Sequence, residues 1–386
     1  MYPNLYYLVK DLFGLDFHWL KLINSFGFFV ALAFVASGYV LYSELKRKES
    51  LGELHPIEES FVLGEPATMG ELITNFIFGF LFGYKILGAF LEGDAISNAQ
   101  SYILSAQGNI GAGILIGALM TYLKWREKDK AKLAKPATKV FTVWPHERVG
   151  DIVLQAALWG FLGAKIFHNL ENIDDLIKDP LGSLISFSGL TFYGGLILAT
   201  IAIIFYVRKY KIRVIHFADA MAPTMLFAYA AGRIGCHMSG DGDWGIPNFN
   251  PKPFTWIPDW AWAYTYPHNV LNEGVHIPGC EGAYCNQLPL TVYPTTLYEI
   301  IIMFALFLIM WSFRKKITQP GILSGIYMIF AGGERFMIEK IRVNNRIASL
   351  PFQPTQAELI SILLILLGLI FIIQSKKWFP KTISNL

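Results

Sequence analysis

The stretch AAGRIGCHMSGDGDWGIPN, residues 231–249, ends a long apolar run with an arginine, a histidine and two aspartates among five glycines. A charged side chain at the centre of a membrane costs roughly 2.5–3.5 kcal/mol even on a lenient insertion scale, so such residues are expected at the ends of membrane helices or in polar interiors. Glycine lets the backbone approach a ligand closely. The stretch therefore predicts the end of a membrane helix that leads into a polar binding site.

The chain as a whole has the composition of a polytopic membrane protein. It has 386 residues, of which 54% are hydrophobic and 16% are charged, and its mean hydropathy is +0.42. Soluble domains carry about 25% charged residues. A run of about 20 apolar residues can cross the hydrocarbon core as a helix. The apolar runs predict an all-α bundle in a single membrane domain with about nine transmembrane helices, near residues 22–43, 72–91, 108–124, 150–168, 187–207, 218–235, 293–313, 321–340 and 357–374.

Lysine and arginine in the short loops indicate the orientation of this bundle. Basic segments follow the odd-numbered predicted spans, as ELKRKE, KWREKDKAKLAK, RKYKIR, FRKK and SKKWFPK. Short basic loops favour the cytoplasmic side, so we predict an outside N-terminus and a cytoplasmic C-terminus. One basic segment, IRVNNR at residues 341–346, then lies on the disfavoured outer side. Its charges are therefore expected to have a function.

Two segments are expected at the outer surface of the membrane. Residues 1–21 alternate tyrosine, leucine, phenylalanine and tryptophan and lack the pattern of a removable signal peptide. This favours an interfacial segment, with a frayed tail as the alternative. The loop 237–292 is rich in aromatic residues and proline over residues 246–292, which fits either a cap over a site or a surface for a partner. Its Cys280 and Cys285 could pair in an oxidising compartment, a question that the sequence leaves open. The ligand spacing of a zinc site is not seen, and neither a metal nor a cofactor is predicted.

An internal repeat divides the first half of the chain. GELITNFIFGFLFGYKI, from Gly70, aligns without a gap on GDIVLQAALWGFLGAKI, from Gly150, and GAGILIG near residue 111 resembles YGGLILA from Tyr193. Duplication of a helical hairpin explains this, with convergence of glycine-rich membrane helices as the alternative. Duplicated membrane segments also occur in transporters, whose binding sites lie between the repeats.

A second cluster of charges lies in GGERFMIEKIRVNNR. Arg335, Glu339 and Arg342 are spaced i, i+4 and i+7, which places them on one face of a helix. Such a face is expected to look into a polar interior, and two arginines against one glutamate favour an anion as the ligand. The alternative is a purely structural network of ion pairs. Arg233 has a similar alternative, as a cap for the last carbonyls of its own helix.

The order of the motifs FYGGLI, DAMAP, AGRIGCHMSGD with WG, YPTTLYE and ERFMIEKIR resembles the prolipoprotein diacylglyceryl transferase family of bacterial inner membranes. The resemblance covers roughly residues 20–45 and most of 140–375. It implies transfer of a diacylglyceryl group from phosphatidylglycerol to a cysteine thiol in a prolipoprotein signal peptide, with glycerol phosphate leaving. The expected partners are phosphatidylglycerol, prolipoprotein signal peptides and membrane lipid, and no nucleic acid. Relative to the family, the hairpin at residues 66–124 is additional.

The resemblance also implies site residues. Arg233 stands where the family has its signature arginine, and Arg335 where it has an arginine near the headgroup. Asp241 or Asp243 takes the place of the signature glutamate, because one extra residue precedes Trp244. Together, the motifs and the resemblance predict catalytic roles for Tyr193, Arg233, His237, Asp241, Asp243 and Arg335, and substrate binding by Phe26, Gly194, Gly195, Gly232, Gly235, Ser239, Tyr298, Glu339 and Arg342.

The chain departs from the family where the proton is expected to move. Tyr193 stands in place of a histidine, and Cys236, His237, Met238 and Ser239 replace an Asn-Phe-x-Asn pattern. Tyr193 is expected to orient the thiol or to take its proton, with His237 as another candidate base and an interfacial anchor as the alternative role of the tyrosine. Two other functions stay open: a transporter built on the repeat, and a catalytically inactive paralogue that binds lipid.

Overall fold

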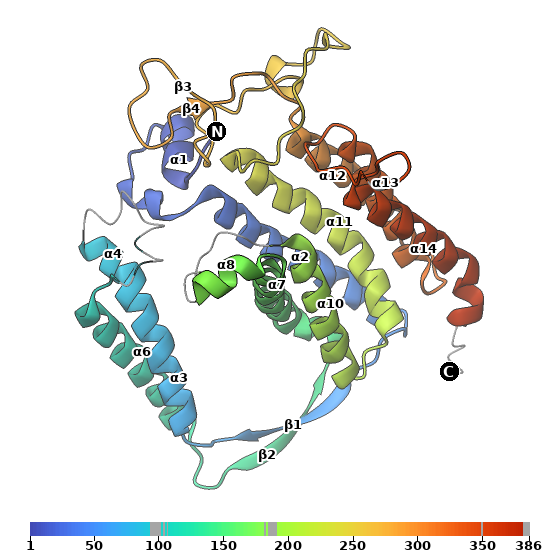
Figure 1. Ribbon diagram of the computed structural model, residues 1–386. Coiled ribbons are helices and arrows are strands. Elements are labelled where there is room, and N and C mark those ends of the chain that lie inside the picture. Colours follow the sequence, from blue (N-terminus) through green and yellow to red (C-terminus); the bar gives the residue numbers. More distant parts are fainter. Residues whose placement is uncertain are drawn as a thin grey trace.

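The computed structural model describes residues 1–92, 102, 105, 107–180, 183, 191–348 and 350–380, which are mostly helical (Figure 1). The predicted loop 92–100 and the start of the predicted span 187–207 lie largely outside the described residues. The long helices coincide with the nine predicted spans: α2 (Ser25–Ser50), α3 (Met69–Phe82) with α4 (Gly88–Leu91), α6 (Ile110–Ala131), α7 (Val149–Glu171), α10 (Phe192–Lys209), α11 (Val214–Ser239), α12 (Thr295–Phe313), α13 (Ile322–Glu339) and α14 (Gln356–Trp378).

Within the described part of the chain, six helical segments are long and apolar enough to cross a membrane. They are Ser25–Ser50, Met69–Leu91, Pro145–Glu171, Val214–Ser239, Thr295–Phe313 and Gln356–Trp378. The prediction of a multi-pass helical membrane protein is therefore confirmed. The number of nine spans and the orientation of the bundle stay predictions.

The main bundle is built around α11, which lies along α2 on one side and α12 on another, while α13 packs along α14 and α7 along α10. Apolar side chains fill its centre, among them the buried Leu226, Met303 and Phe307. The outward face of α14 is exposed and apolar, as expected for a helix that contacts lipid. Its exposed residues include Leu359, Ile362, Leu363, Leu366, Leu369, Ile370 and Ile373.

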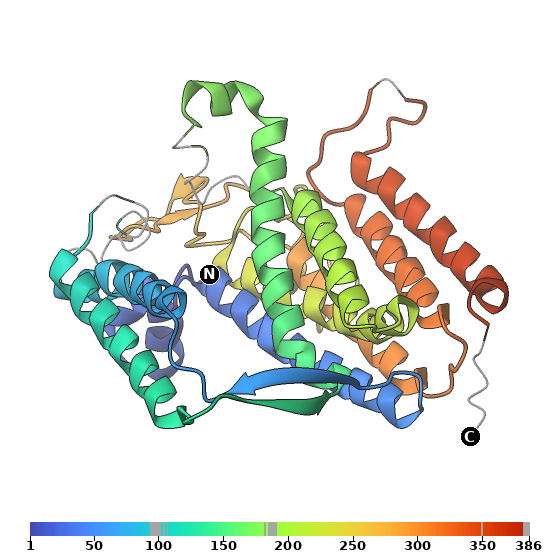
Figure 2. The same ribbon diagram turned by 90° about the horizontal axis from the view of Figure 1, so that it is seen from below.

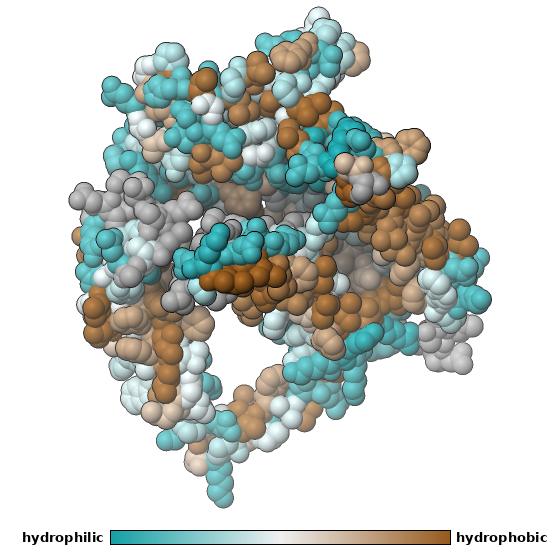
Figure 3. All heavy atoms as spheres, in the orientation of Figure 1, coloured by the Kyte–Doolittle hydropathy of each residue, from teal (hydrophilic) through white to brown (hydrophobic). Residues whose placement is uncertain are grey.

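The hairpin predicted at residues 66–124 as additional to the family comprises α3 to α6 (residues 69–131) and stands apart from the main bundle. It is called the additional hairpin below. An antiparallel ribbon of β1 (Ile57–Leu63) and β2 (Ala137–Val143) carries it, with Ile57 opposite Val143 at the base and Leu63 opposite Ala137 at the tip (Figures 1 and 2). The helices of this hairpin pack chiefly on each other. The space-filling view in Figure 3 shows an opening between the hairpin and the main bundle, closed below by the ribbon. This ribbon was not predicted from the sequence.

The two copies of the repeat share their helix contacts. A Cβ added to Gly83 would lie 2.3 Å from the carbonyl oxygen of Ala112, and a Cβ added to Gly163 would lie 2.4 Å from that of Gly194. Gly83 aligns with Gly163 in the repeat, and Ala112 aligns with Gly194. Glycine at such positions lets two membrane helices approach backbone to backbone. The same close contact at matching positions favours duplication over convergence.

The segment between α11 and α12 covers one end of the main bundle together with α1 (Leu5–Phe13) (Figure 1). The backbone N–H of Tyr2 donates to the carbonyl of Met238 at 2.7 Å, which ties the N-terminal segment to the end of α11. The loop contains the short strands β3 (Val275–His276) and β4 (Asn286–Gln287) and a disulfide between Cys280 and Cys285. The question that the sequence left open for these cysteines is thus answered.

Candidate functional site

The candidate site lies where α11 ends, α12 begins and α13 ends. Helix α11 stops at Gly240, whose φ of 64° is left-handed and whose N–H donates to the carbonyl of Cys236 at 3.0 Å. Gly242 also has a positive φ, of 97°. Both positions favour glycine, because a residue with a side chain is strained at a positive φ. The turn reverses the chain and brings Asp243 back to the last turns of α11.

Arg233 on α11 contacts two acidic residues from other parts of the chain. Its Nε atom lies 2.7 Å from Oε2 of Glu299, and its Nη1 atom pairs with Asp243. Its Nη2 atom donates to the hydroxyl of Tyr229 at 3.1 Å. Arg233 therefore joins α11 to α12 and to the glycine-rich turn.

Glu299 is the centre of the cluster, and sequence reasoning gave it no role. Its side chain is fully buried near the N-terminal end of α12. Its Oε1 atom lies 3.5 Å from Nη1 of Arg335 and 3.4 Å from Nη1 of Arg342, in addition to the contact with Arg233. The available signal was an acid near the start of a membrane helix, which is expected to face a polar interior.

The charges on α13 are arranged partly as predicted. Arg335 pairs with Glu339 at 3.0 Å across one helical turn. The helix ends at Glu339, however, so Arg342 lies in the following turn and not on the same helical face. It is held there because the N–H of Ile246 donates to the carbonyl of Ile341 at 2.9 Å. From that position its Nη2 atom reaches Asp243 at 2.5 Å.

The charges of this arginine cluster balance. The three arginines contact three carboxylates, so the net positive charge expected from α13 alone is offset by residues of α12 and the turn. The members are Arg233, Arg335 and Arg342 with Asp243, Glu299 and Glu339. An anionic ligand must therefore compete with a carboxylate for the arginines.

Asp243 is the carboxylate that a ligand could replace, because it lies in the turn rather than in a helix. Burial alone would raise the pKa of Asp243, but Arg233 and Arg342 outweigh burial and lower it. Burial, together with the charge of Asp243, raises the pKa of Asp241. Of the two aspartates that could match the family glutamate, Asp243 is the one that pairs with the arginines.

Cys236, Asp241 and Asp243 also lie close together, with one potential ligand atom of each within 4.8 Å of the others. Asp243 already pairs with two arginines, and Nη1 of Arg233 lies 3.6 Å from the sulfur of Cys236. The positive charges beside this trio disfavour a cation. We assign no metal to it.

Several predicted residues lie near the cluster and contact other groups. His237 places Nδ1 3.0 Å from the hydroxyl of Thr296. The buried Ser239 hydroxyl donates to the carbonyl of Gly235 at 2.9 Å, within its own helix. Tyr298 donates to the carbonyl of Trp262 in the covering loop at 3.4 Å. These contacts place the three side chains around the cluster rather than in it.

Two of the predicted residues, Phe26 and Gly235, lie at a contact between helices, and a third, Gly232, borders open space on α11. A Cβ at Gly235 would lie 3.0 Å from the carbonyl oxygen of Phe26, so these two residues mark the contact of α11 with α2. A Cβ at Gly232 would meet no atom within 4 Å, so space is open beside this residue, one position before Arg233.

Tyr193, Gly194 and Gly195 lie at the start of α10. A Cβ at Gly194 would lie 2.3 Å from Cβ of Phe167, and one at Gly195 would lie 2.7 Å from the carbonyl oxygen of Gly160. Both glycines therefore allow α10 to pack on α7. The ion pairs described above for the arginine cluster do not involve α10, and the roles predicted for these three residues stay predictions.

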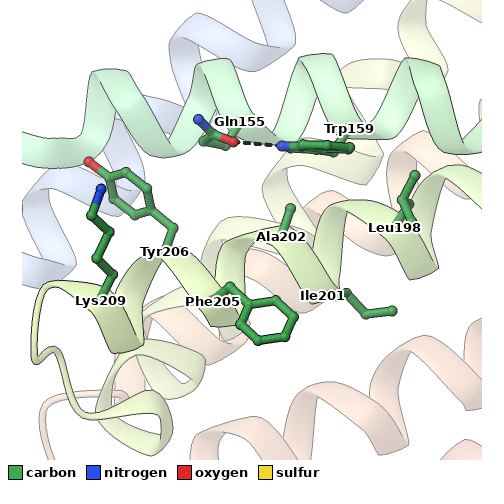
Figure 4. A pocket seen from close by; sticks show the side chains of 8 residues that line it. All are labelled: Gln155, Trp159, Leu198, Ile201, Ala202, Phe205, Tyr206 and Lys209. Atoms are coloured by element: carbon green, nitrogen blue, oxygen red, sulfur yellow. Dashed lines mark hydrogen bonds between the residues drawn. The ribbon is translucent and has the colours of Figure 1, made fainter.

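An apolar groove of about 360 Å³ lies between α7 and α10 (Figure 4). Trp159 donates through Nε1 to Oε1 of Gln155 at 2.7 Å along one wall. The groove contains none of the predicted site residues and has a single charged lining residue, Lys209. The groove thus lacks the charged groups that the arginine cluster contains.

The comparison with known proteins agrees with the family resemblance that the order of the motifs indicated. The chain matches the family described as prolipoprotein diacylglyceryl transferase over residues 108–374. It is 26% identical over 283 residues to a protein of Leptospira interrogans, covering 61% of this chain and 81% of that one. It is 27% identical over 250 residues to a protein of a Marinomonas strain, with 63% and 82% covered. A protein of Corynebacterium efficiens is 29% identical over 271 residues, with 69% and 76% covered. All three relatives carry the name phosphatidylglycerol–prolipoprotein diacylglyceryl transferase.

Proposed function

Because the chain belongs to the prolipoprotein diacylglyceryl transferase family, we propose that it transfers the diacylglyceryl group of phosphatidylglycerol to a cysteine thiol of prolipoproteins. The cysteine is the lipobox residue of the signal peptide, and glycerol phosphate is the second product. The setting is the bacterial inner membrane, which agrees with the six apolar helices long enough to span a bilayer.

The observation that carries this proposal is the convergence of three arginines from different segments around the buried carboxylate of Glu299. Two of these arginines also contact Asp243. Arg233 and Arg342 hold the Asp243 carboxylate between their guanidinium groups. A planar guanidinium binds a phosphate with the same paired geometry as a carboxylate. The phosphodiester of phosphatidylglycerol takes the place of Asp243 in this proposal, and the glycine-rich turn lets Asp243 move away.

Two of the arginines then have separate roles in the reaction. Arg233, together with the turn at Gly240, positions the headgroup, while Arg335 stabilises the charge of the departing glycerol phosphate. Glu299 contacts all three arginines and keeps their guanidinium groups oriented. Preorganised positive groups of this kind lower the barrier where negative charge develops.

The thiol proton needs a path that the arginines do not supply. A cysteine thiol has a pKa near 8.5, so it is mostly protonated at neutral pH and another group must take its proton. Tyr193 or His237 orients the thiol in this proposal. The Nδ1 atom of His237 lies 3.0 Å from the hydroxyl of Thr296. This contact fixes the imidazole ring and supports a role for it in orienting the thiol.

Mass spectrometry of a lipobox peptide tests the proposal. The purified protein is incubated with the peptide and phosphatidylglycerol, and a mass increase of one diacylglyceryl group on the cysteine is expected. Arg233→Ala and Arg335→Ala should each abolish the increase, while a peptide with serine in place of the cysteine serves as the negative control. Absence of the modified peptide with folded wild-type protein would contradict the function. Full activity of either variant would contradict the site.

A further inference from the structure

Glu334 is a buried acid beside the arginine cluster that the roles above do not use. It lies on α13 directly before Arg335, and only 4% of its surface is exposed. It shares a helical face with Ala331 and Ile338, which face the interior of the bundle. The side chain is thus surrounded by protein and not by lipid headgroups or water.

Glu334 differs from the other buried acids of the described chain in having no partner. Glu44 pairs with Arg314 at 2.5 Å, and Asp219 accepts three hydrogen bonds from Gly321 and Ser324. Glu299, Glu339 and Glu358 likewise pair with arginine or lysine. Oε1 of Glu334 is buried and contacts no donor among the described residues.

Its surroundings place Glu334 within electrostatic range of the reaction. The charged groups that act electrostatically on it are Arg233 from α11, Glu299 from α12, Arg335 from its own helix and Arg342 from the following turn. The three arginines are already balanced by three carboxylates, so an ionised Glu334 would be a surplus negative charge. A buried carboxylate without a hydrogen-bonded partner is costly, and the neutral acid is the form that burial favours.

We propose that Glu334 holds a proton beside the arginine cluster and donates it to glycerol phosphate as this product leaves. The inference rests on the proposed function. In the step, the cysteine sulfur forms a bond to the glyceryl carbon, and the bond from that carbon to the phosphate oxygen breaks with its electron pair going to the oxygen. Glu334 gives its proton to the phosphate, and the proton lost by the thiol returns Glu334 to the acid form. No proton is gained or lost over the cycle.

The chemistry explains why an acid would be kept at this place. The arginines stabilise the phosphate while it carries one negative charge in the phosphodiester. Departure of the monoester adds a second negative charge in a site whose own charges are balanced. A proton from Glu334 cancels that second charge, and the product leaves as a monoanion.

The test compares Glu334→Gln with wild type in the transfer assay over a range of pH. Glutamine keeps the shape of the side chain but cannot donate a carboxyl proton. Loss of a general acid lowers turnover by about 100-fold. The ratio of the wild-type to the variant rate should fall as pH rises, because only the wild type loses a needed proton. Gly333→Ala is the matched control on the same helix, since a Cβ there would meet no atom within 4 Å.

Two further measurements separate proton donation from a structural role. Glu334→Asp keeps an acid and should keep the pH-dependent ratio at a lower rate. The infrared carbonyl band of a protonated carboxylic acid should be present in wild type and missing in Glu334→Gln.

A Glu334→Gln rate within about twofold of wild type would overturn the inference. So would a lowered rate whose ratio to wild type does not change with pH, or a band that persists in the variant. A wild-type protein without transfer activity would instead contradict the proposed function, and the infrared band would still decide the protonation of Glu334.

Discussion

At the scale of single residues, the site depends on contacts between side chains that are far apart in the sequence. The pairing of Arg335 with Glu339 follows from their spacing on a helix, and the sequence was sufficient to predict it. Glu299 could not be recognised in the same way, because its partners come from α11, α13 and the turn after α13. The choice between Asp241 and Asp243 depended on the path of the glycine-rich turn, which two left-handed glycines determine.

Arg233→Lys tests whether the planar guanidinium is needed. Arg233 contacts Glu299, Asp243 and Tyr229 at once, and a lysine ammonium cannot reproduce this fork. We expect transfer to fall by about 10–100-fold while the protein stays folded. The rate of peptide modification measures the effect. Arg126→Lys, at an exposed position of α6, is the control and should keep the wild-type rate.

Asp243→Asn tests the competition between carboxylate and phosphate. Removal of the negative charge should make glycerol phosphate bind about tenfold more tightly, as measured by calorimetry. The pKa of Asp243 is lowered below 3.8, so the carboxylate is ionised from about pH 5 to about pH 8 and the gain should be present throughout this range. The gain disappears only when the pH falls through that lowered pKa.

The matched variant for this comparison is Asp241→Asn. Asp241 forms no ion pair with the arginines among the described contacts, so its variant should show a smaller gain. Equal gains for the two variants would contradict the special position of Asp243 between Arg233 and Arg342.

At the scale of elements, hydrophobic runs predicted where helices occur but not all of their ends. The helix that carries Arg335 stops at Glu339, and this end is set by the contact of Ile246 with Ile341 in another part of the chain. The ribbon of β1 and β2 was missed because two short strands without buried residues give little periodic signal. The aligned glycine positions of the repeat, in contrast, could be recognised in the sequence.

The α7–α10 contact can be tested with glycine substitutions. A Cβ at Gly163 would lie 2.4 Å from the carbonyl of Gly194, whereas a Cβ at Gly160 would meet no atom within 4 Å. Gly163→Ala should therefore destabilise the protein by about 1–3 kcal/mol, and Gly160→Ala should not. Thermal unfolding in detergent measures both. A destabilised Gly160→Ala variant with an unchanged Gly163→Ala variant would contradict the described packing.

At the scale of the whole molecule, the site and the additional hairpin are separate features. All residues of the arginine cluster come from α11, α12, α13 and the turns that follow α11 and α13. The hairpin packs chiefly on itself at the end of its ribbon. Its copy of the repeat carries Gly111 where the other copy carries Tyr193, so it lacks the hydroxyl to which a role is assigned in the proposed reaction.

The additional hairpin can be removed without cutting the main bundle. Phe61 lies opposite Lys139 in the ribbon, so residues 62–138 can be replaced by Asn-Gly, which forms a two-residue turn between antiparallel strands. This cut keeps Glu59, which pairs with Arg148 at 2.5 Å next to the start of α7. We expect the shortened protein to modify the lipobox peptide at a rate within about threefold of the full chain, because no residue of the arginine cluster is lost. Loss of transfer by a shortened protein that still unfolds cooperatively would show that the hairpin takes part in the reaction, and would place part of the substrate path in the opening between the hairpin and the main bundle.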